Sequence, residues 1–170
     1  QSYGFALKEK PDRPSASAAQ QQLTQKLAGQ AHSLKDALSS LNALAQDAEN
    51  RRSLRVPLPG NYQNNYPLRH LIELFESVQA LEQKGSALHF ASEADRDFVK
   101  GGWLELHTMQ ALNQTHGDIG VQDKAIGLEV VHEATGTQNE LDIAFMARNR
   151  LFVIECKTAR IDKPQGGGKN

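Results

Sequence analysis

Apolar residues recur at helical spacing through most of the first half of the chain. From about residue 15 or 17 to residue 50, one face of a predicted helix carries Leu23, Leu27, Leu34, Leu38 and Leu41. Pro57-Leu58-Pro59-Gly60-Asn61 breaks this pattern. Helical spacing returns over residues 67–83, and residues 87–91 are a short strand candidate. The first half is therefore predicted to be mostly helical.

A third helix is predicted from Ser92 to Gln114. Ser92 suits its first position, because a serine side chain there accepts a hydrogen bond from the backbone of the first turn. Gly101-Gly102 interrupts the pattern at a cost of about 2 kcal/mol relative to two alanines. Either the helix begins after these glycines, or the backbone there comes close to another group.

After Gly117 the hydrophobic period changes toward two residues, which is typical of strands. Strands are predicted over residues 126–132, 139–147 and 151–156. Arg148-Asn149-Arg150 separates the last two like a tight turn, which predicts a hairpin. The fold class is therefore α/β, with a central mixed sheet flanked by helices and preceded by a mostly helical connector.

Composition indicates how the chain is divided. Of its 170 residues, 39% are hydrophobic and 6% are aromatic, which is lean for a globular chain and predicts a solvated segment. We expect residues 1–60 to be a helical connector that includes a linker, and residues 61–170 to be the folded domain. The chain opens on Gln1 and closes after the glycines at 166–168, so we expect a fragment of a longer protein, truncated at its C-terminus.

Charge and cysteine content limit the possible binding partners and the cellular compartment. The net charge of −1 gives no overall positive field, so nucleic-acid binding would need a local patch, a metal or a partner. Cys156 is the only cysteine, which excludes an internal disulfide and fits a reducing cytoplasm. No apolar run reaches the roughly 18 residues of a membrane span, and no signal peptide opens the chain. We therefore expect a cytoplasmic protein without a membrane partner.

The most informative stretch joins two predicted strands. Asp142 lies on the first, within Asn139-Glu140-Leu141-Asp142, and the second runs Leu151-Phe152-Val153-Ile154 before Glu155-Cys156-Lys157. Four apolar residues in a row indicate a strand buried on both faces. Since residues i and i+2 of a strand share a face, Glu155 and Lys157 are expected side by side, with Cys156 turned into the core as a packing residue.

Two neighbouring carboxylates and a lysine suit phosphodiester cleavage. The carboxylates repel each other unless a cation lies between them, and hard oxygen ligands favour Mg²⁺ or Mn²⁺. Such an ion polarises a phosphoryl oxygen and lowers the pKa of a bound water. A lysine beside it can orient the water or stabilise the developing charge. The competing interpretation is that Glu155 and Lys157 form an ordinary ion pair at a strand end.

This arrangement resembles the PD-(D/E)xK pattern of restriction-endonuclease-like enzymes, with Asp142 as the first acid and Glu155-Cys156-Lys157 as the second half. These enzymes often carry a further acid on a preceding helix, and Glu105 in Gly101-Gly102-Trp103-Leu104-Glu105 is the candidate. The resemblance implies that Glu105, Asp142, Glu155 and Lys157 are catalytic and that the three acids hold the metal.

The combined segments over residues 86–165 resemble the nuclease domain of CRISPR-associated ancillary nucleases, which join an N-terminal CARF sensor to a restriction-endonuclease-like domain. The resemblance implies a homodimer that cuts DNA, and in some members RNA, with Mn²⁺ or Mg²⁺ when cyclic tetra-adenylate binds the sensor. No sensor is visible in residues 1–60, so the activator would act through a domain outside this chain.

Further basic residues are candidates for phosphate contacts near the site; they are Arg148, Arg150, Lys163 and Lys169. Two alternatives stay open. A Holliday-junction resolvase or Mrr-like endonuclease shares the motif, and a basic dimeric surface would favour it. A regulatory or binding module that has lost activity would share the fold, and absence of metal binding would favour it.

Overall fold

The computed structural model describes residues 5–8 and 16–158, and the chain divides into two compact units. The first unit joins the described residues up to Ala28 with Trp103–Cys156, and the second joins Gly29–Gly102 with the residues from Lys157 onward. The expected division at residue 60 coincides with neither boundary. Both units combine segments that are distant along the chain, and the division into a connector and a folded domain stays a prediction.

The first predicted helix is two helices. α1 (Ala18–Gln30) begins with reciprocal hydrogen bonds, in which the backbone N–H of Gln20 donates to Ser17 Oγ and the backbone N–H of Ser17 donates to Gln20 Oε1. α2 (Lys35–Asn50) starts after a turn, where the Ser33 hydroxyl donates to the carbonyl oxygen of Gln30. Serine side chains that capture backbone groups compete with helix continuation, so the leucine spacing alone could not show the break.

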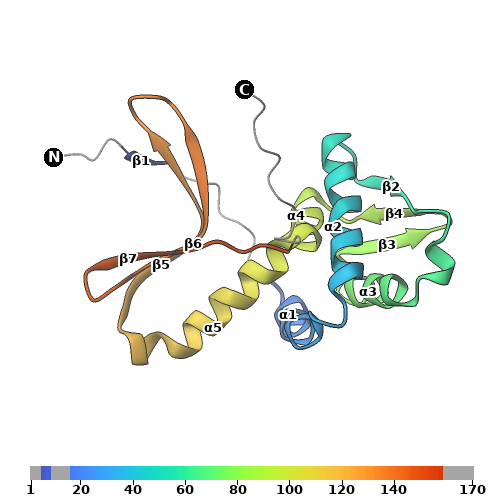
Figure 1. Ribbon diagram of the computed structural model, residues 1–170, viewed down its shortest axis with the longest axis horizontal. Helices are drawn as coiled ribbons and strands as arrows, with labels where there is room; N and C mark the ends of the chain where they lie inside the picture. Colours follow the sequence, from blue (N-terminus) through green and yellow to red (C-terminus); the bar gives the residue numbers. More distant parts are fainter. Residues whose placement is uncertain (1–4, 9–15, 159–170) are drawn as a thin grey trace, which may run out of the picture. The chain divides into compact units, whose positions relative to one another are not determined.

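The first unit contains a four-stranded sheet in the order β1-β5-β6-β7. Its strands are β1 (Phe5–Lys8), β5 (Val121–His132), β6 (Gln138–Ala147) and β7 (Arg150–Ile154), and every pair is antiparallel rather than mixed. α5 (Trp103–Ile119) packs on this sheet through Met109 and Leu112, which meet Ile143 and Phe145 in the core of the unit (Figure 1).

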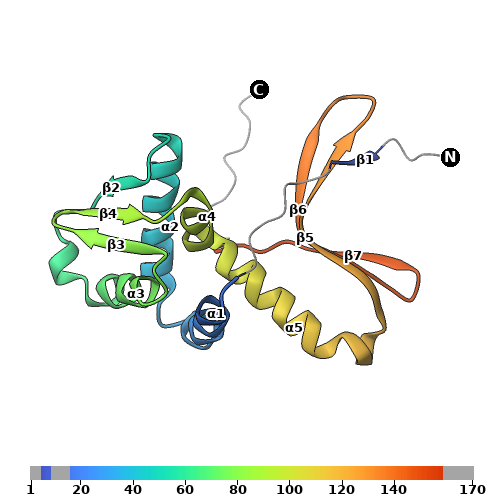
Figure 2. The ribbon, with the colours of Figure 1, turned by 180° about the vertical axis from the view of Figure 1, so that it is seen from behind.

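The β5–β6 pair turns sharply midway along its length, as Figures 1 and 2 both show. β1 pairs with residues 129–132 of β5, whereas β7 pairs with residues 143–147 of β6. Between these stretches the register of β5 and β6 brings Gly127 opposite Asp142, and Gly127 has φ of 60°. A left-handed glycine inside a strand bends it and twists it more strongly. The fold therefore places Asp142 at the bend of the sheet.

Replacing Gly127 by alanine is expected to destabilise the protein by about 1–3 kcal/mol, because a Cβ is strained at positive φ. The measurement is the urea midpoint followed by circular dichroism. Gly117→Ala is the matched control in the same unit, since Gly117 lies in α5 and an added Cβ there meets nothing within 4 Å. That change should stabilise by about 0.5–1 kcal/mol. Equal effects of the two substitutions would contradict the strain argument.

The second unit packs helices α2 and α3 (Tyr66–Glu76) on a three-stranded antiparallel sheet of order β2-β4-β3 (Figure 2). The strands are β2 (Arg55–Pro57), β3 (Leu81–Lys84) and β4 (Ala87–Phe90), and the last confirms the short strand candidate. The helix predicted over 67–83 ends early, because Ser77 Oγ donates to the carbonyl oxygen of Leu74 and Gln79 takes a φ of 60°.

The segment before α5 confirms one sequence expectation and resolves another. Ser92 caps α4 (Glu93–Asp97), with its hydroxyl accepting from the backbone N–H of Asp95. The chain is kinked over Phe98–Gly102, where Gly101 has a non-helical φ of 167°, and α5 begins only after the two glycines. A Cβ on Gly102 would lie 3.2 Å from the carbonyl oxygen of Asp97, so the backbone also makes the expected close approach. None of the described helices is both long and apolar enough to cross a membrane.

Candidate active site

β6 and β7 bring two of the expected catalytic acids opposite each other. Ile143 pairs with Ile154, so the same register continued by one residue sets Asp142 against Glu155. Directly opposed residues of antiparallel strands point to the same face, with Cβ atoms about 5 Å apart. β7 ends at Ile154, two residues earlier than predicted, because Asp142 Oδ2 accepts a hydrogen bond of 2.6 Å from the backbone N–H of Cys156. The first acid thus fixes the chain beside the second.

α5 supplies the third acid from the helix face that packs on the sheet. Glu105, Thr108, Met109 and Leu112 are spaced three, four and seven residues apart, which places them on one stripe of the helix. Since Met109 and Leu112 pack in the core of the unit, Glu105 also faces the sheet. One turn from Glu105, Thr108 Oγ1 lies 3.7 Å from Cys156 Sγ.

The pKa of the Cys156 thiol depends on its burial and on the charges around it. Burial raises its pKa above the ordinary value; a hydrogen bond with Thr108 lowers it, and the negative charges of Asp142, Glu105 and Glu155 raise it further. A raised pKa leaves little thiolate near neutral pH, which agrees with the expected packing role of Cys156. These directions agree with the geometry, in which Asp142 is set against Glu155 and Glu105 lies on the face of α5 that packs on the sheet.

Removing one of these charges is expected to lower the pKa of Cys156. In Glu155→Gln the side chain keeps its size but loses the charge that raises the thiol pKa, so alkylation by iodoacetamide should become faster at mildly alkaline pH. The rate is measured against pH, and the sole cysteine makes the signal unambiguous. Glu133→Gln is the control on the same unit. An unchanged profile in Glu155→Gln would show that Glu155 lies too far from the thiol to matter.

The acids suit a hard divalent cation by donor type, since carboxylate oxygens are the usual ligands of Mg²⁺ and Mn²⁺. Asp142 and Glu155 oppose each other across the hairpin, and Glu105 faces the sheet from α5. Within the part of the chain that the structure describes, no three His, Cys, Asp or Glu side chains are arranged to hold a metal ion. The metal role of Glu105, Asp142 and Glu155 therefore stays a prediction.

Lys157 lies between two anchored residues. Before it, the backbone of Cys156 is held by Asp142 in the first unit. After it, in the second unit, the Thr158 hydroxyl accepts a hydrogen bond of 2.7 Å from Asn42 Nδ2 of α2 and donates to the carbonyl oxygen of Lys100 at 3.4 Å. Lys100 is itself paired with Glu49 at 2.7 Å, which lowers the pKa of that carboxyl. The side chain of Lys157 is exposed.

The other basic candidates do not lie beside the acids. Arg148 forms the hairpin turn with Asn149, and Arg150 opens β7, five or more residues along the hairpin from Asp142 and Glu155. The expectation that these arginines contact phosphates stays a prediction. Lys163 and Lys169 lie outside the described residues.

Sequence reasoning did not find three of the residues that hold this site. Thr108 could have been found from its spacing of three residues after Glu105 on a helix. Gly127 could have been noted as a glycine inside an apolar strand. Asn42 carried no local signal, because its contact with Thr158 joins positions that are 116 residues apart.

The chain is similar to known proteins in sequence and in fold. Residues 92–169 match the family model of the Card1-like endonuclease domain. The structure is similar to that of protein VC1899 from Vibrio cholerae, with a TM-score of 0.80 and 27% sequence identity, over 91% of this chain and 41% of that chain. It is also similar to Can2 from Sulfobacillus thermosulfidooxidans, solved in complex with cyclic tetra-adenylate, with a TM-score of 0.63 and 23% identity, over 92% of this chain and 38% of that chain.

These comparisons confirm the expected α/β fold, since the two sheets and their helices are shared with solved proteins. The chain spans about two fifths of the length of the two proteins. No curated protein matches the chain. The match of residues 92–169 covers all four expected catalytic residues, Glu105, Asp142, Glu155 and Lys157.

Proposed function

We propose that this chain is the nuclease part of a CRISPR-associated defence protein that hydrolyses phosphodiester bonds with Mg²⁺ or Mn²⁺, in DNA as the first candidate substrate and RNA as the second. The observation that carries the proposal is the convergence of two acids, because the strand register sets Asp142 against Glu155 and Asp142 accepts a hydrogen bond from the backbone N–H of Cys156, the residue after Glu155. This convergence falls inside the residues that match the Card1-like endonuclease domain. An ordinary ion pair of Glu155 and Lys157 would not require a third acid on the packed face of α5.

Each side chain has a proposed role. Asp142, Glu155 and Glu105 would hold the ion, which when bound supplies a polarised phosphoryl oxygen and a more acidic water. The hydrogen bond from the backbone N–H of Cys156 fixes the Asp142 carboxylate in one orientation. The side chain of Asp142 therefore loses little conformational entropy when substrate binds. Lys157 would orient the attacking water and stabilise the negative charge that develops on the phosphate.

The proposed control of this activity lies outside the chain. Can2 was solved in complex with cyclic tetra-adenylate, and its structure extends well beyond the part that this chain matches. We propose that the parent protein binds the same activator through a further domain and acts as a homodimer.

The test is cleavage of labelled single-stranded DNA, plasmid DNA and RNA by the parent protein with Mn²⁺ or Mg²⁺, with and without cyclic tetra-adenylate. Activator-dependent cutting supports the whole proposal. Cutting that ignores the activator keeps the nuclease but moves it toward the resolvase or Mrr-like group. No cutting under any condition, together with no metal binding by calorimetry, would leave a binding module and overturn the proposal.

A further inference from the structure

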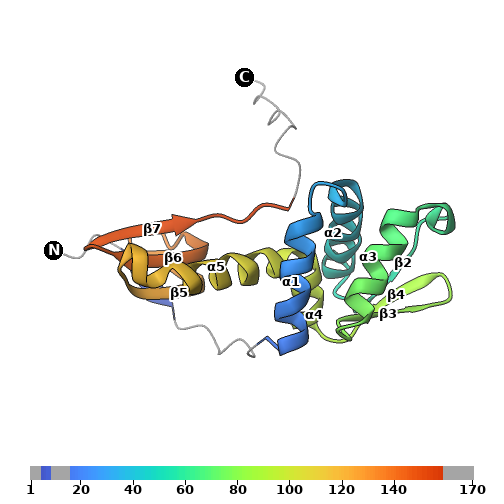
Figure 3. The ribbon, with the colours of Figure 1, turned by 90° about the horizontal axis from the view of Figure 1, so that it is seen from below.

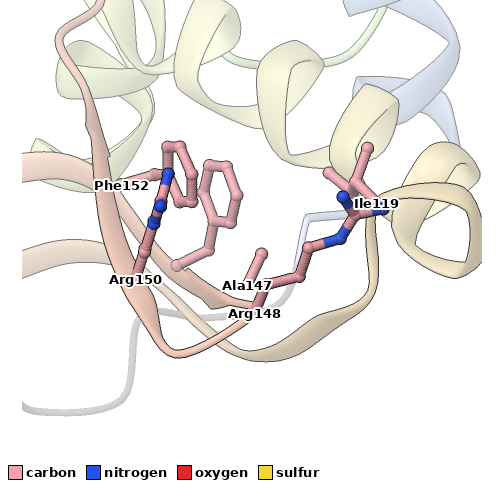
Figure 4. Close-up of a pocket in the computed structure, with 6 residues that line it drawn as sticks. Ile119, Ala147, Arg148, Arg150 and Phe152 are labelled. Atoms are coloured by element: carbon pink, nitrogen blue, oxygen red, sulfur yellow. The ribbon is translucent and has the colours of Figure 1, made fainter.

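A second surface of the first unit has the chemistry of a nucleotide-binding site, at the end of the β6–β7 hairpin away from the acids. It is a hollow of about 560 Å³, called here the tip hollow, lined by Ile119, Phe145, Ala147, Arg148, Arg150 and Phe152 (Figure 4). Its walls combine two aromatic rings, aliphatic carbon and two guanidinium groups, and its lining includes no carboxylate. An anion with an apolar, flat portion is complementary to such walls.

The two rings form a ready stacking platform. Phe145 and Phe152 are directly paired across β6 and β7, and their rings stack with centroids 5.0 Å apart and an interplanar angle of 11°. Phe145 is buried in the core of the unit and holds its partner in place, while 44% of Phe152 is exposed. An aromatic side chain that is packed on one face and exposed on the other can stack on a base with little further loss of its own conformational entropy.

The arginines bring positive charge to the same place. Arg150 shares a face of β7 with Phe152, two residues away, so its side chain lies beside the exposed ring. Arg148 enters from the hairpin turn, and both guanidiniums reach the hollow (Figure 4). Ile119 ends α5, whose C-terminus carries about half a negative charge, and two full positive charges outweigh it.

The backbone conformation of the hairpin turn also indicates a functional position. Arg148 and Asn149 both have positive φ, of 50° and 58°. Two-residue hairpin turns of this kind favour asparagine and glycine, because a side chain is strained there. An arginine at the first position costs stability that a glycine or asparagine would not, and such strain is typical of functional positions.

We propose that the tip hollow binds one nucleotide of the nucleic-acid substrate, with its base stacked on Phe152 and its phosphate held by Arg148 and Arg150; this rests on the proposed nuclease function. Five residues of β6 separate Asp142 from Ala147, a span of roughly 17 Å at strand rise. The hollow therefore holds the substrate several nucleotides away from the bond that is cut, as a second point of attachment. β7 is the last described strand of the sheet and lies beside β6, as Figure 3 shows, so the hairpin has one side that no other described strand covers.

The test is binding of a fluorescein-labelled single-stranded oligonucleotide by the parent protein, followed by anisotropy in the presence of EDTA. Phe152→Leu removes the stacking ring and is expected to raise the Kd about tenfold or more, whereas Phe152→Tyr keeps the ring and should bind as the native protein does. Arg148→Gln/Arg150→Gln should weaken binding and reduce the slope of log Kd against log salt by roughly 1.4, the value for two phosphate contacts on a single strand.

The matched control is Arg52→Gln/Arg55→Gln, which removes the same charge from an exposed basic stretch of the second unit and should leave the salt slope unchanged. Urea midpoints establish that each variant is folded. If Phe152→Leu and the arginine variant bind the oligonucleotide as tightly as the native protein does, the proposal is overturned. It is also overturned if these variants sediment as monomers where the native protein sediments as a dimer, because the hollow would then be an interface between copies. EDTA separates these results from catalysis, so failure to cut counts only against the nuclease proposal.

Discussion

Asp142→Asn is expected to slow phosphodiester cleavage about a thousandfold or more. The substitution removes a charge that would hold the metal, and metal-ion stabilisation of the transition state amounts to several kcal/mol, with each 1.36 kcal/mol giving a factor of ten. The side-chain oxygen of asparagine can still accept the hydrogen bond that Cys156 donates to Asp142. Stability should therefore change little while activity is lost. The measurement is the single-turnover rate with Mn²⁺ beside the urea midpoint.

Asp142→Ala separates the chemical role of Asp142 from its structural role. It leaves the half-buried N–H of Cys156 without its acceptor, which should cost a further 1–3 kcal/mol or so of stability. Both variants should be inactive, but only the alanine variant should unfold at lower urea. Full activity in Asp142→Asn would refute the assignment of this residue as a metal ligand.

Lys157→Ala is expected to lower the cleavage rate about 10²–10⁴-fold, the usual contribution of a positioned proton-transfer group. Lys157→Arg keeps the positive charge, but a guanidinium does not give up its proton as an ammonium can. Partial activity of this variant would therefore assign charge stabilisation as the main role of Lys157. Metal binding, measured by calorimetry, should persist in both variants. Lys26→Ala, on the exposed side of α1, is the matched control. A Lys157→Ala enzyme that cuts at the native rate would remove this lysine from the mechanism.

The sequence was most informative where chemistry and periodicity coincide. Alternation of apolar residues predicted β6 and β7 to within two residues, and the acids at 142 and 155 followed from that hairpin. Glu105 was found because a helix preceded the strands, and the structure puts it on the face that packs on the sheet.

What the sequence could not show depends on contacts between distant positions. The two units interleave along the chain, so no composition shift marks their boundaries at residues 28 and 102. The early ends of α1 and α3 depend on single serine hydroxyls and on Gln79, whereas the leucine pattern runs through both ends. The bend at Gly127 depends on a backbone angle that period-two alternation does not encode.

β7 exposes apolar side chains that favour aggregation, and the charged residues on either side of it counteract this tendency. Among the described strands it is the last of its sheet, and the expectation that it is buried on both faces is wrong, because Leu151, Phe152 and Val153 are exposed on it at 61%, 44% and 47%. An apolar edge strand of this kind is a template for unwanted pairing with other chains and for aggregation. Arg148 and Arg150 precede the apolar run and Glu155 and Lys157 follow it, in the pattern of gatekeeper residues that discourage such pairing. The charges proposed to bind and cut nucleic acid thus also keep the protein in solution, and variants that neutralise them will be the most prone to precipitate.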